Sequence, residues 1–76
     1  MDAEALKFLA VGLAVGLGML GPGLGLGLIG YSALQGIARN PEARGPIFTN
    51  MILVAGLTEA IGIYVLIIGI ILAMIA

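Results

Sequence analysis

The sequence contains no cysteine, no histidine and no tryptophan, and its 76 residues include only three basic and four acidic side chains. The absence of cysteine and histidine excludes disulfides, thiol nucleophiles and zinc or haem sites built on those ligands. Three basic residues provide no positively charged surface for nucleic acid. No catalytic triad can be assembled either. We therefore expect a non-catalytic chain that binds no metal, no organic cofactor and no nucleic acid.

Apolar side chains dominate the composition. They make up 62% of the residues, and charged residues make up 9%, against roughly 25% in a typical soluble domain. Residues 8–38 carry no charge, and residues 47–76 carry one, Glu59. Each run exceeds the ~20 residues that cross a bilayer as a helix, and in lipid its backbone must pair within the segment. We predict an all-α membrane protein, one transmembrane hairpin over 1–76, with helices at about 5–38 and 47–76 and a polar loop at 39–46.

The few charges also predict an orientation. The loop holds Arg39 and Arg44, whereas the N-terminal segment holds only Lys7. The positive-inside rule therefore places the loop in the cytoplasm and both termini on the other side of the membrane. Pro41 and Pro46 suit a turn, because each proline keeps the residue before it out of helical conformation. The short chain without a targeting extension favours a bacterial inner membrane.

Glycine is concentrated in the first span, where residues 12–30 hold eight of the 13 glycines. At about 100° per residue they fall on two opposite faces of a helix. Small residues let helices approach closely in a membrane, so two opposed faces predict a neighbour on each side, repeated head to tail and closing into a homo-oligomeric ring. One face has Gly12, Gly16, Gly23, Gly27 and Gly30, the other has Gly18, Gly21 and Gly25 with Ala14 and Ser32, and the predicted packing residues are Gly16, Gly21, Gly23, Gly25 and Gly27.

Glu59 is the single charge in the second span. An ionised side chain at mid-membrane costs about 2.5–3.5 kcal/mol on insertion scales. Arg44, the nearest basic residue in sequence, is 15 positions away, which is roughly 22 Å along a helix. Desolvation without a nearby cation favours the neutral acid. Such a carboxyl can carry a proton, and the alternative is a purely structural hydrogen bond between helices.

The surroundings of Glu59 are predicted to be small. If the hairpin turns near Glu42, Glu59 lies level with the glycine-rich part of the first helix. Thr58 and Tyr64 are the other polar side chains nearby. Thr58 either serves this site or bonds the carbonyl four residues earlier on its own helix. Tyr64 points away from Glu59 on the same helix, so it either packs or supplies its hydroxyl to a neighbouring copy. The predicted site-lining residues are Gly25, Leu26, Gly27, Ala55, Gly62 and Tyr64.

These features together resemble the c subunit of F-type ATP synthases, the proteolipid of the membrane rotor ring, over nearly the whole chain. The resemblance rests on the alternating glycines of 21–27, the turn Ala38-Arg39-Asn40-Pro41-Glu42-Ala43, the carboxyl within Leu57-Thr58-Glu59-Ala60, and the spacing between turn and carboxyl. Asn40 departs mildly from the glutamine that the family often has there.

The resemblance implies a ring of hairpins in lipid, with first helices inside and second helices outside. It implies that Glu59 takes a proton from one half-channel of the a subunit and releases it into the other. It also implies that the loop residues Arg39, Asn40, Pro41 and Glu42 contact the gamma and epsilon subunits of the central stalk, so that rotation drives ATP synthesis elsewhere in the complex.

The transported ion is predicted to be H⁺. Sodium-binding relatives typically place a glutamine on the first helix and a serine or threonine after the carboxylate, and the matching positions here are Leu26 and Ala60, followed by Ile61. A hard cation needs several oxygen ligands, which these side chains lack. A sodium rotor, a small channel and a structural hairpin are the alternatives. A channel would need a polar stripe along a span.

Overall fold

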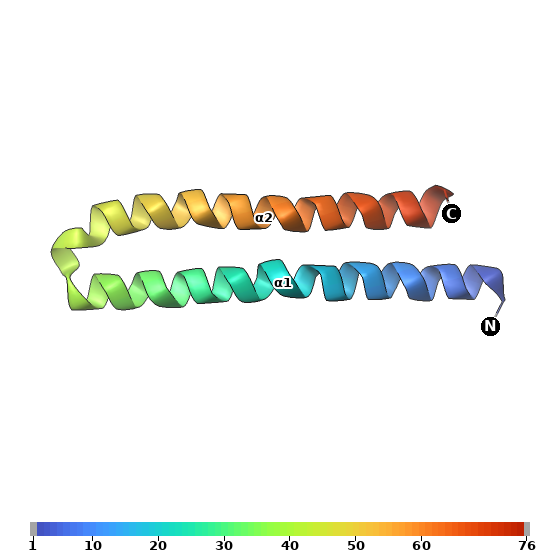
Figure 1. Ribbon diagram of the computed structural model, residues 1–76, viewed down its shortest axis with the longest axis horizontal. Coiled ribbons are helices and arrows are strands. Elements are labelled where there is room, and N and C mark those ends of the chain that lie inside the picture. Colours follow the sequence, from blue (N-terminus) through green and yellow to red (C-terminus); the bar gives the residue numbers. More distant parts are fainter. Residues whose placement is uncertain (1, 76) are drawn as a thin grey trace.

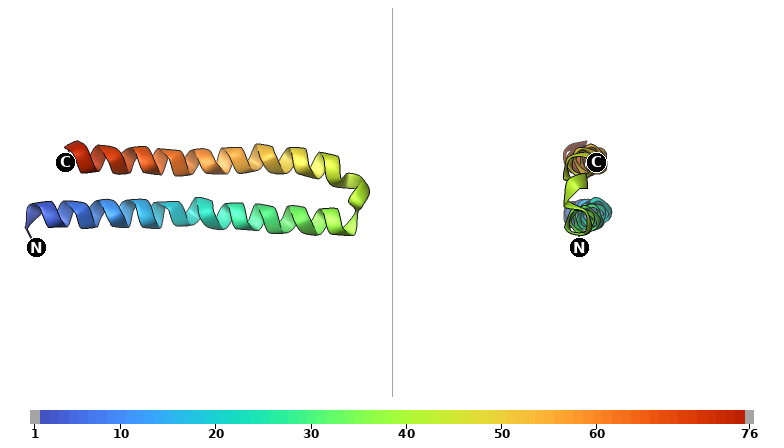
Figure 2. Two further views of the ribbon diagram at one scale, coloured as in Figure 1. Left: turned by 180° about the vertical axis from the view of Figure 1, so that it is seen from behind. Right: turned by 90° about the vertical axis from the view of Figure 1, so that its left-hand side faces the viewer.

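A computed structural model describes residues 2–75 and shows two long antiparallel helices joined by a tight turn (Figures 1 and 2). Helix α1 covers Ala3–Arg39, the 3-10 turn η1 covers Pro41–Ala43, and helix α2 covers Arg44–Ile75. The described residues contain no strand. The prediction of an all-α two-helix hairpin is confirmed.

The ends of α1 are stabilised by local interactions. Asp2 precedes the helix, and its carboxylate accepts a hydrogen bond from the backbone N–H of Ala5 at 2.8 Å. Such a cap pairs one of the amides that have no partner within the first turn. At the other end, Arg39 lies in the last turn, where a cation interacts favourably with the helix dipole. The backbone N–H of Asn40 closes the helix on the carbonyl of Gly36 at 3.0 Å.

The connection is shorter than the predicted loop at 39–46. Arg39 still belongs to α1, Asn40 is the one residue outside a helical element, and α2 already begins at Arg44. Pro46 therefore lies in the first turn of a helix instead of a loop. A proline is tolerated there because an amide in the first turn has no carbonyl partner to lose. The first helix also begins at Ala3 rather than near residue 5. The predicted end of the second helix, Ala76, lies outside the described residues.

Glycines form the contact between the two helices. A Cβ at Gly18 would lie 2.6 Å from Cγ1 of Val65. A Cβ at Gly36 would lie 3.1 Å from Cδ1 of Ile47. On α2, a Cβ at Gly69 would collide with the side chain of Val15. Each of these glycines therefore receives a branched side chain of the opposite helix. This is the small-residue packing that holds helices together in lipid.

Gly18→Ala should loosen the hairpin, because the stiff side chain of Val65 cannot move away from the added methyl group without shifting the backbone. Overpacking of this kind costs about 1–3 kcal/mol. Thermal denaturation of the purified protein in detergent measures the effect. Gly45→Ala is the matched control, since a Cβ there meets nothing within 4 Å. Equal stability of the two variants would contradict the described packing.

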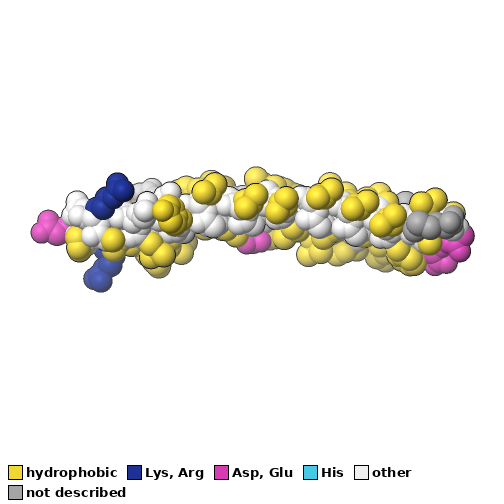
Figure 3. Space-filling view, turned by 90° about the horizontal axis from the view of Figure 1, so that it is seen from below, with side chains coloured by type: hydrophobic (Ala, Val, Ile, Leu, Met, Phe, Trp, Pro, Cys, Tyr) yellow, Lys and Arg dark blue, Asp and Glu magenta, His cyan; other side chains and the backbone are white. Residues whose placement is uncertain are grey.

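The hairpin has no apolar core of its own. It measures 58 × 18 × 8 Å. Within residues 2–75 only Pro22, Gly62 and Gly69 are buried, and large apolar side chains are exposed along both helices. Both helices are long and apolar enough to cross a membrane. Figure 3 shows charged side chains at the two ends of the rod, an acidic patch near its middle and apolar side chains between them. Lipid and neighbouring proteins must cover this surface.

Candidate functional site

Glu59 lies at the midpoint of α2. It lies 15 positions after Arg44 at the start of the helix and 16 positions before Ile75 at its end, so it is roughly 22–24 Å from either end. Its side chain is exposed on the isolated hairpin. The basic residues Arg39 and Arg44 lie at the turn, and Lys7 lies in the first turns of α1. Glu59 is therefore an acid among apolar residues, and no basic side chain of the chain lies at its depth.

The carboxyl lies close to the surface of its own helix, over Gly62. A Cβ at Gly62 would be 3.3 Å from Oε1 of Glu59 and 3.2 Å from Cε of Met19 on α1. Gly62 is buried by these two side chains. The absence of a side chain at Gly62 therefore leaves the space that the carboxyl and the methionine share. Ala55, one turn before Glu59, is half-buried and small as well.

The depth of Glu59 relative to α1 is set by a neighbouring contact. A Cβ at Gly25 would lie 3.2 Å from Cγ2 of Thr58, so Glu59 is within one residue of the level of Gly25. The hydroxyl of Thr58 donates to the carbonyl of Val54 at 2.9 Å. This bond within α2 leaves the Thr58 side chain facing α1 with its methyl group.

The hairpin has two sides, which carry different residues. Glu59 lies about 80° round α2 from the line that faces α1. Met19 and Gly62 meet at one edge of the hairpin, next to Glu59. Gly16, Gly23 and Gly27 of α1 lie on this same side, which we call the Glu59 side. Tyr64 lies about 140° round the helix from Glu59 and is 67% exposed. Its hydroxyl cannot reach the carboxyl of its own chain, and we call its side the Tyr64 side.

The predicted glycine faces are divided between two different kinds of neighbour. Only Gly25 of the predicted packing residues contacts α2, so one of the two faces is used in part by the second helix of the same chain. Three other glycines lie at this contact, Gly18, Gly36 and Gly69. The predicted packing residues included none of them. Small residues spaced by seven, as at Ala55, Gly62 and Gly69, are the signal that indicates such a seam. The glycines of α1 whose Cβ would meet nothing within 4 Å are Gly12, Gly16, Gly21, Gly23, Gly27 and Gly30.

The residues predicted to form a contact loop all lie at the turn. Arg39, Asn40, Pro41 and Glu42 are exposed at the end of the rod opposite the termini (Figure 1). Three of them are in helical elements, with Asn40 between the two. The turn is therefore a short polar tip made largely of helical residues. Among the described residues no group of three or more acidic, histidine or cysteine side chains is placed to hold a metal ion.

Comparisons with known proteins all indicate the same family. The family model for the ATP synthase c subunit matches residues 9–72. The chain is 55% identical to the ATP synthase c subunit of Dehalococcoides mccartyi over 76 residues, which cover both chains completely. It is 46% identical to the ATP synthase c subunit of Chloroflexus aurantiacus over 66 residues, covering 87% of each chain. The corresponding protein of Prochlorococcus marinus is 46% identical over 69 residues, covering 91% of this chain and 85% of that one.

Proposed function

Because this chain belongs to the family of ATP synthase c subunits, we propose that it is the rotor-ring component of a proton-translocating ATP synthase with Glu59 as the proton carrier. As a member of this family it is an ion-carrying membrane protein that assembles into a ring within the synthase. The observation that carries the finer proposal is the acid at the midpoint of an apolar helix, with no cation at its depth. ATP chemistry belongs to other subunits, and this chain is non-catalytic.

The two sides of the hairpin support a ring with α1 inside and α2 outside. The open glycines Gly16, Gly23 and Gly27 lie roughly 110–150° round α1 from the line that faces α2. Gly21, also open, lies about 100° from that line on the other side. Each α1 can therefore approach a neighbouring α1 closely on both sides while its own α2 occupies the outer face. A head-to-tail contact of this kind repeats from copy to copy and closes by rotation.

The same geometry brings together two polar groups that one chain keeps apart. In the ring, the Glu59 side of one copy meets the Tyr64 side of the next. Tyr64 of the neighbouring copy then becomes the phenol available to the carboxyl. A hydrogen bond to the protonated acid compensates part of the cost of holding it in lipid. This assigns Tyr64 to the site of the adjacent copy.

Glu59 then acts by gaining and losing one proton per passage. It receives a proton from one half-channel of the a subunit, crosses the lipid as a neutral acid and releases the proton into the other half-channel. An arginine of the a subunit keeps the two paths separate. One elementary charge moved through 100 mV is worth about 2.3 kcal/mol. Several such steps are summed by the ring for each ATP.

The polar tip of the hairpin fits the contact with the stalk. Arg39, Asn40, Pro41 and Glu42 are exposed there, and we assign them to the contact with the gamma and epsilon subunits. The excess of arginine at this end places the tip in the cytoplasm, with both termini on the opposite side. The relatives are bacterial proteins, which supports a bacterial inner membrane.

The ion is assigned to H⁺ because the site offers few oxygen ligands besides the carboxylate of Glu59. Leu26 on α1 and Ala60 on α2 lie close to the depth of Glu59, and both are apolar and half-buried. The hydroxyl of Thr58 donates to the carbonyl of Val54, and the Thr58 side chain faces α1, about 100° round α2 from Glu59. Sodium would therefore find one carboxylate and few other oxygens, which is a poor set for a hard cation.

Ion-driven synthesis in vesicles tests this assignment. The complete synthase, reconstituted in vesicles, should make ATP when a pH gradient and a membrane potential are imposed. The rate should be the same with and without sodium. A rate that requires sodium, or a sodium gradient that drives synthesis at constant pH, would contradict the proton assignment and favour a sodium rotor.

A further inference from the structure

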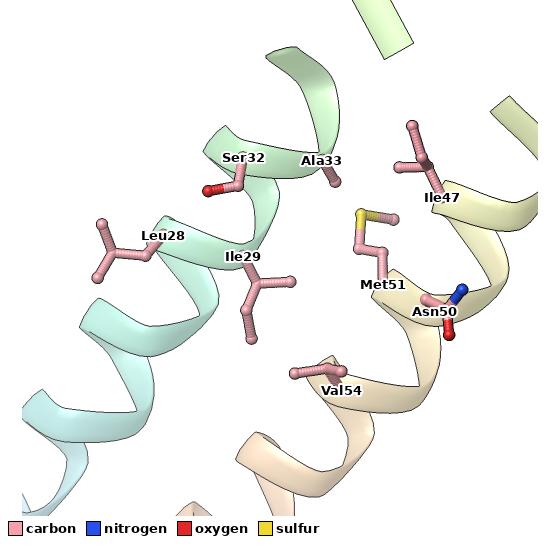
Figure 4. A pocket seen from close by; sticks show the side chains of 8 residues that line it. All are labelled: Leu28, Ile29, Ser32, Ala33, Ile47, Asn50, Met51 and Val54. Atoms are coloured by element: carbon pink, nitrogen blue, oxygen red, sulfur yellow. The ribbon is translucent and has the colours of Figure 1, made fainter. Parts of the chain in front are cut away.

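A hollow of about 370 Å³ opens on the Tyr64 side of the hairpin, near the turn. Figure 4 shows Ile29 and Met51 between the two helices, and Ser32 and Asn50 at its edges. The amide nitrogen of Asn50 donates to the carbonyl of Pro46 at 2.9 Å, so this group is already bonded. The residues lining the hollow are Leu28, Ile29, Ser32, Ala33, Ile47, Asn50, Met51 and Val54.

A large apolar side chain stands at the same depth on the other side of the hairpin. Phe48 is 54% exposed and lies between Ile47 and Val54, which line the hollow. It lies about 20° round α2 from the direction of Glu59, so it shares the Glu59 side. It also leans toward α1, whereas Leu53, at a similar depth, points away from α1. The hairpin leaves about half of the Phe48 side chain exposed.

We infer that Phe48 of the neighbouring copy fills this hollow in the assembled ring. The inference rests on the proposed function, because it requires the Glu59 side of one copy to face the Tyr64 side of the next. Copies related by rotation keep the same depth, so Phe48 meets the hollow and not another part of the neighbour. Closer to the middle of the membrane, the same side of α1 has the open glycines Gly27 and Gly30, which let the copies approach closely. The outer helices, which diverge from one another in a ring, are then joined by an aromatic side chain.

Cysteine cross-linking tests the contact directly, because the chain has no cysteine of its own. The pair is Phe48→Cys with Asn50→Cys. These positions lie on opposite sides of one helix, about 160° apart, so they cannot link within a chain. Oxidation of the assembled complex should give a ladder of oligomers up to the full ring. The control pair, Phe48→Cys with Leu53→Cys, moves the second thiol to the outward face and should give no ladder.

A second measurement separates this inference from the proposed function. Native mass spectrometry reports whether the ring is present before oxidation. A ring that forms but gives no ladder, or that retains a phospholipid chain in place of the contact, would overturn the inference and leave the rotor assignment standing. Absence of any ring from the wild-type complex would overturn both.

Side-chain size gives an independent readout without cysteines. Phe48→Ala should lower the temperature at which the ring dissociates in dodecyl sulfate, and Phe48→Leu should recover most of the loss. Leu53→Ala, which removes apolar bulk from the outward face, should leave that temperature unchanged. Equal behaviour of Phe48→Ala and Leu53→Ala would count against the contact.

Discussion

Glu59→Gln reduces proton-driven ATP synthesis to the background of the assay, while the ring still assembles. The amide occupies nearly the same volume beside Gly62 and Met19 as the carboxyl does, so the packing of the hairpin is kept. An amide cannot bind and release a proton near neutral pH, so the ring has no group that exchanges protons with the half-channels. The measurement is ATP synthesis by the reconstituted complex under an imposed pH gradient and potential, with ring assembly followed by native mass spectrometry.

Glu59→Asp is the matched control for this result. It keeps a carboxyl and shortens the side chain by one methylene, so part of the synthesis rate should remain. Loss of the ring in Glu59→Gln would show instead that the acid has a structural role, as a hydrogen-bond donor between helices. Substantial synthesis by Glu59→Gln would remove the residue from the proton path.

Gly27→Val prevents ring assembly while the single hairpin still inserts and folds. A Cβ at Gly27 meets nothing within 4 Å of the same chain, so the hairpin has room for the larger side chain. In the ring, the same position faces the neighbouring α1. Overpacking costs about 1–3 kcal/mol at each contact, and the cost recurs at every interface between copies. Gel electrophoresis and native mass spectrometry should find monomers in place of rings.

A series in side-chain size makes this prediction specific. Gly27→Ala should weaken the ring less than Gly27→Val does. Circular dichroism should show unchanged helix content in both. Gly18→Val is the contrasting variant. Gly18 contacts Val65 of its own chain, so this substitution should destabilise the hairpin itself. Normal rings from Gly27→Val would mean that the open glycines do not face one another, and the arrangement of α1 inside the ring would be wrong.

The hairpin and the depth of Glu59 could be predicted from the placement of seven charges. Charges at both ends and one acid between them leave few alternatives in lipid, since unbroken apolar runs must be helical. The predicted loop, 39–46, was too long, and the cause is the placement of Pro46. Proline is unfavourable inside a helix but is tolerated in its first turn, and the sequence around Pro46 does not distinguish these cases. The short 3-10 turn at Pro41–Ala43 allows α2 to begin at Arg44.

The glycine pattern predicted faces but not partners. Helical periodicity shows that Gly18 and Gly25 share one direction and Gly23 and Gly27 another. It does not show that the first pair packs against the chain's own α2 while the second is left open. That division depends on the register between helices, which the turn sets. The prediction for Tyr64 was limited in the same way. One chain holds Tyr64 and Glu59 on different sides, so helical periodicity alone could not show which copy brings them together.

Carbodiimide labelling tests whether Glu59 is a protonated acid in an apolar site. The reagent attacks protonated carboxyls in such sites, and mass spectrometry of the labelled ring identifies the modified residue. Glu59 alone should be modified, labelling should rise as the pH falls, and sodium should have no effect. Protection by sodium would identify a sodium site instead. No labelling of Glu59 at any pH would show an acid that is ionised or sealed within protein, and the proton-carrier account would then be wrong.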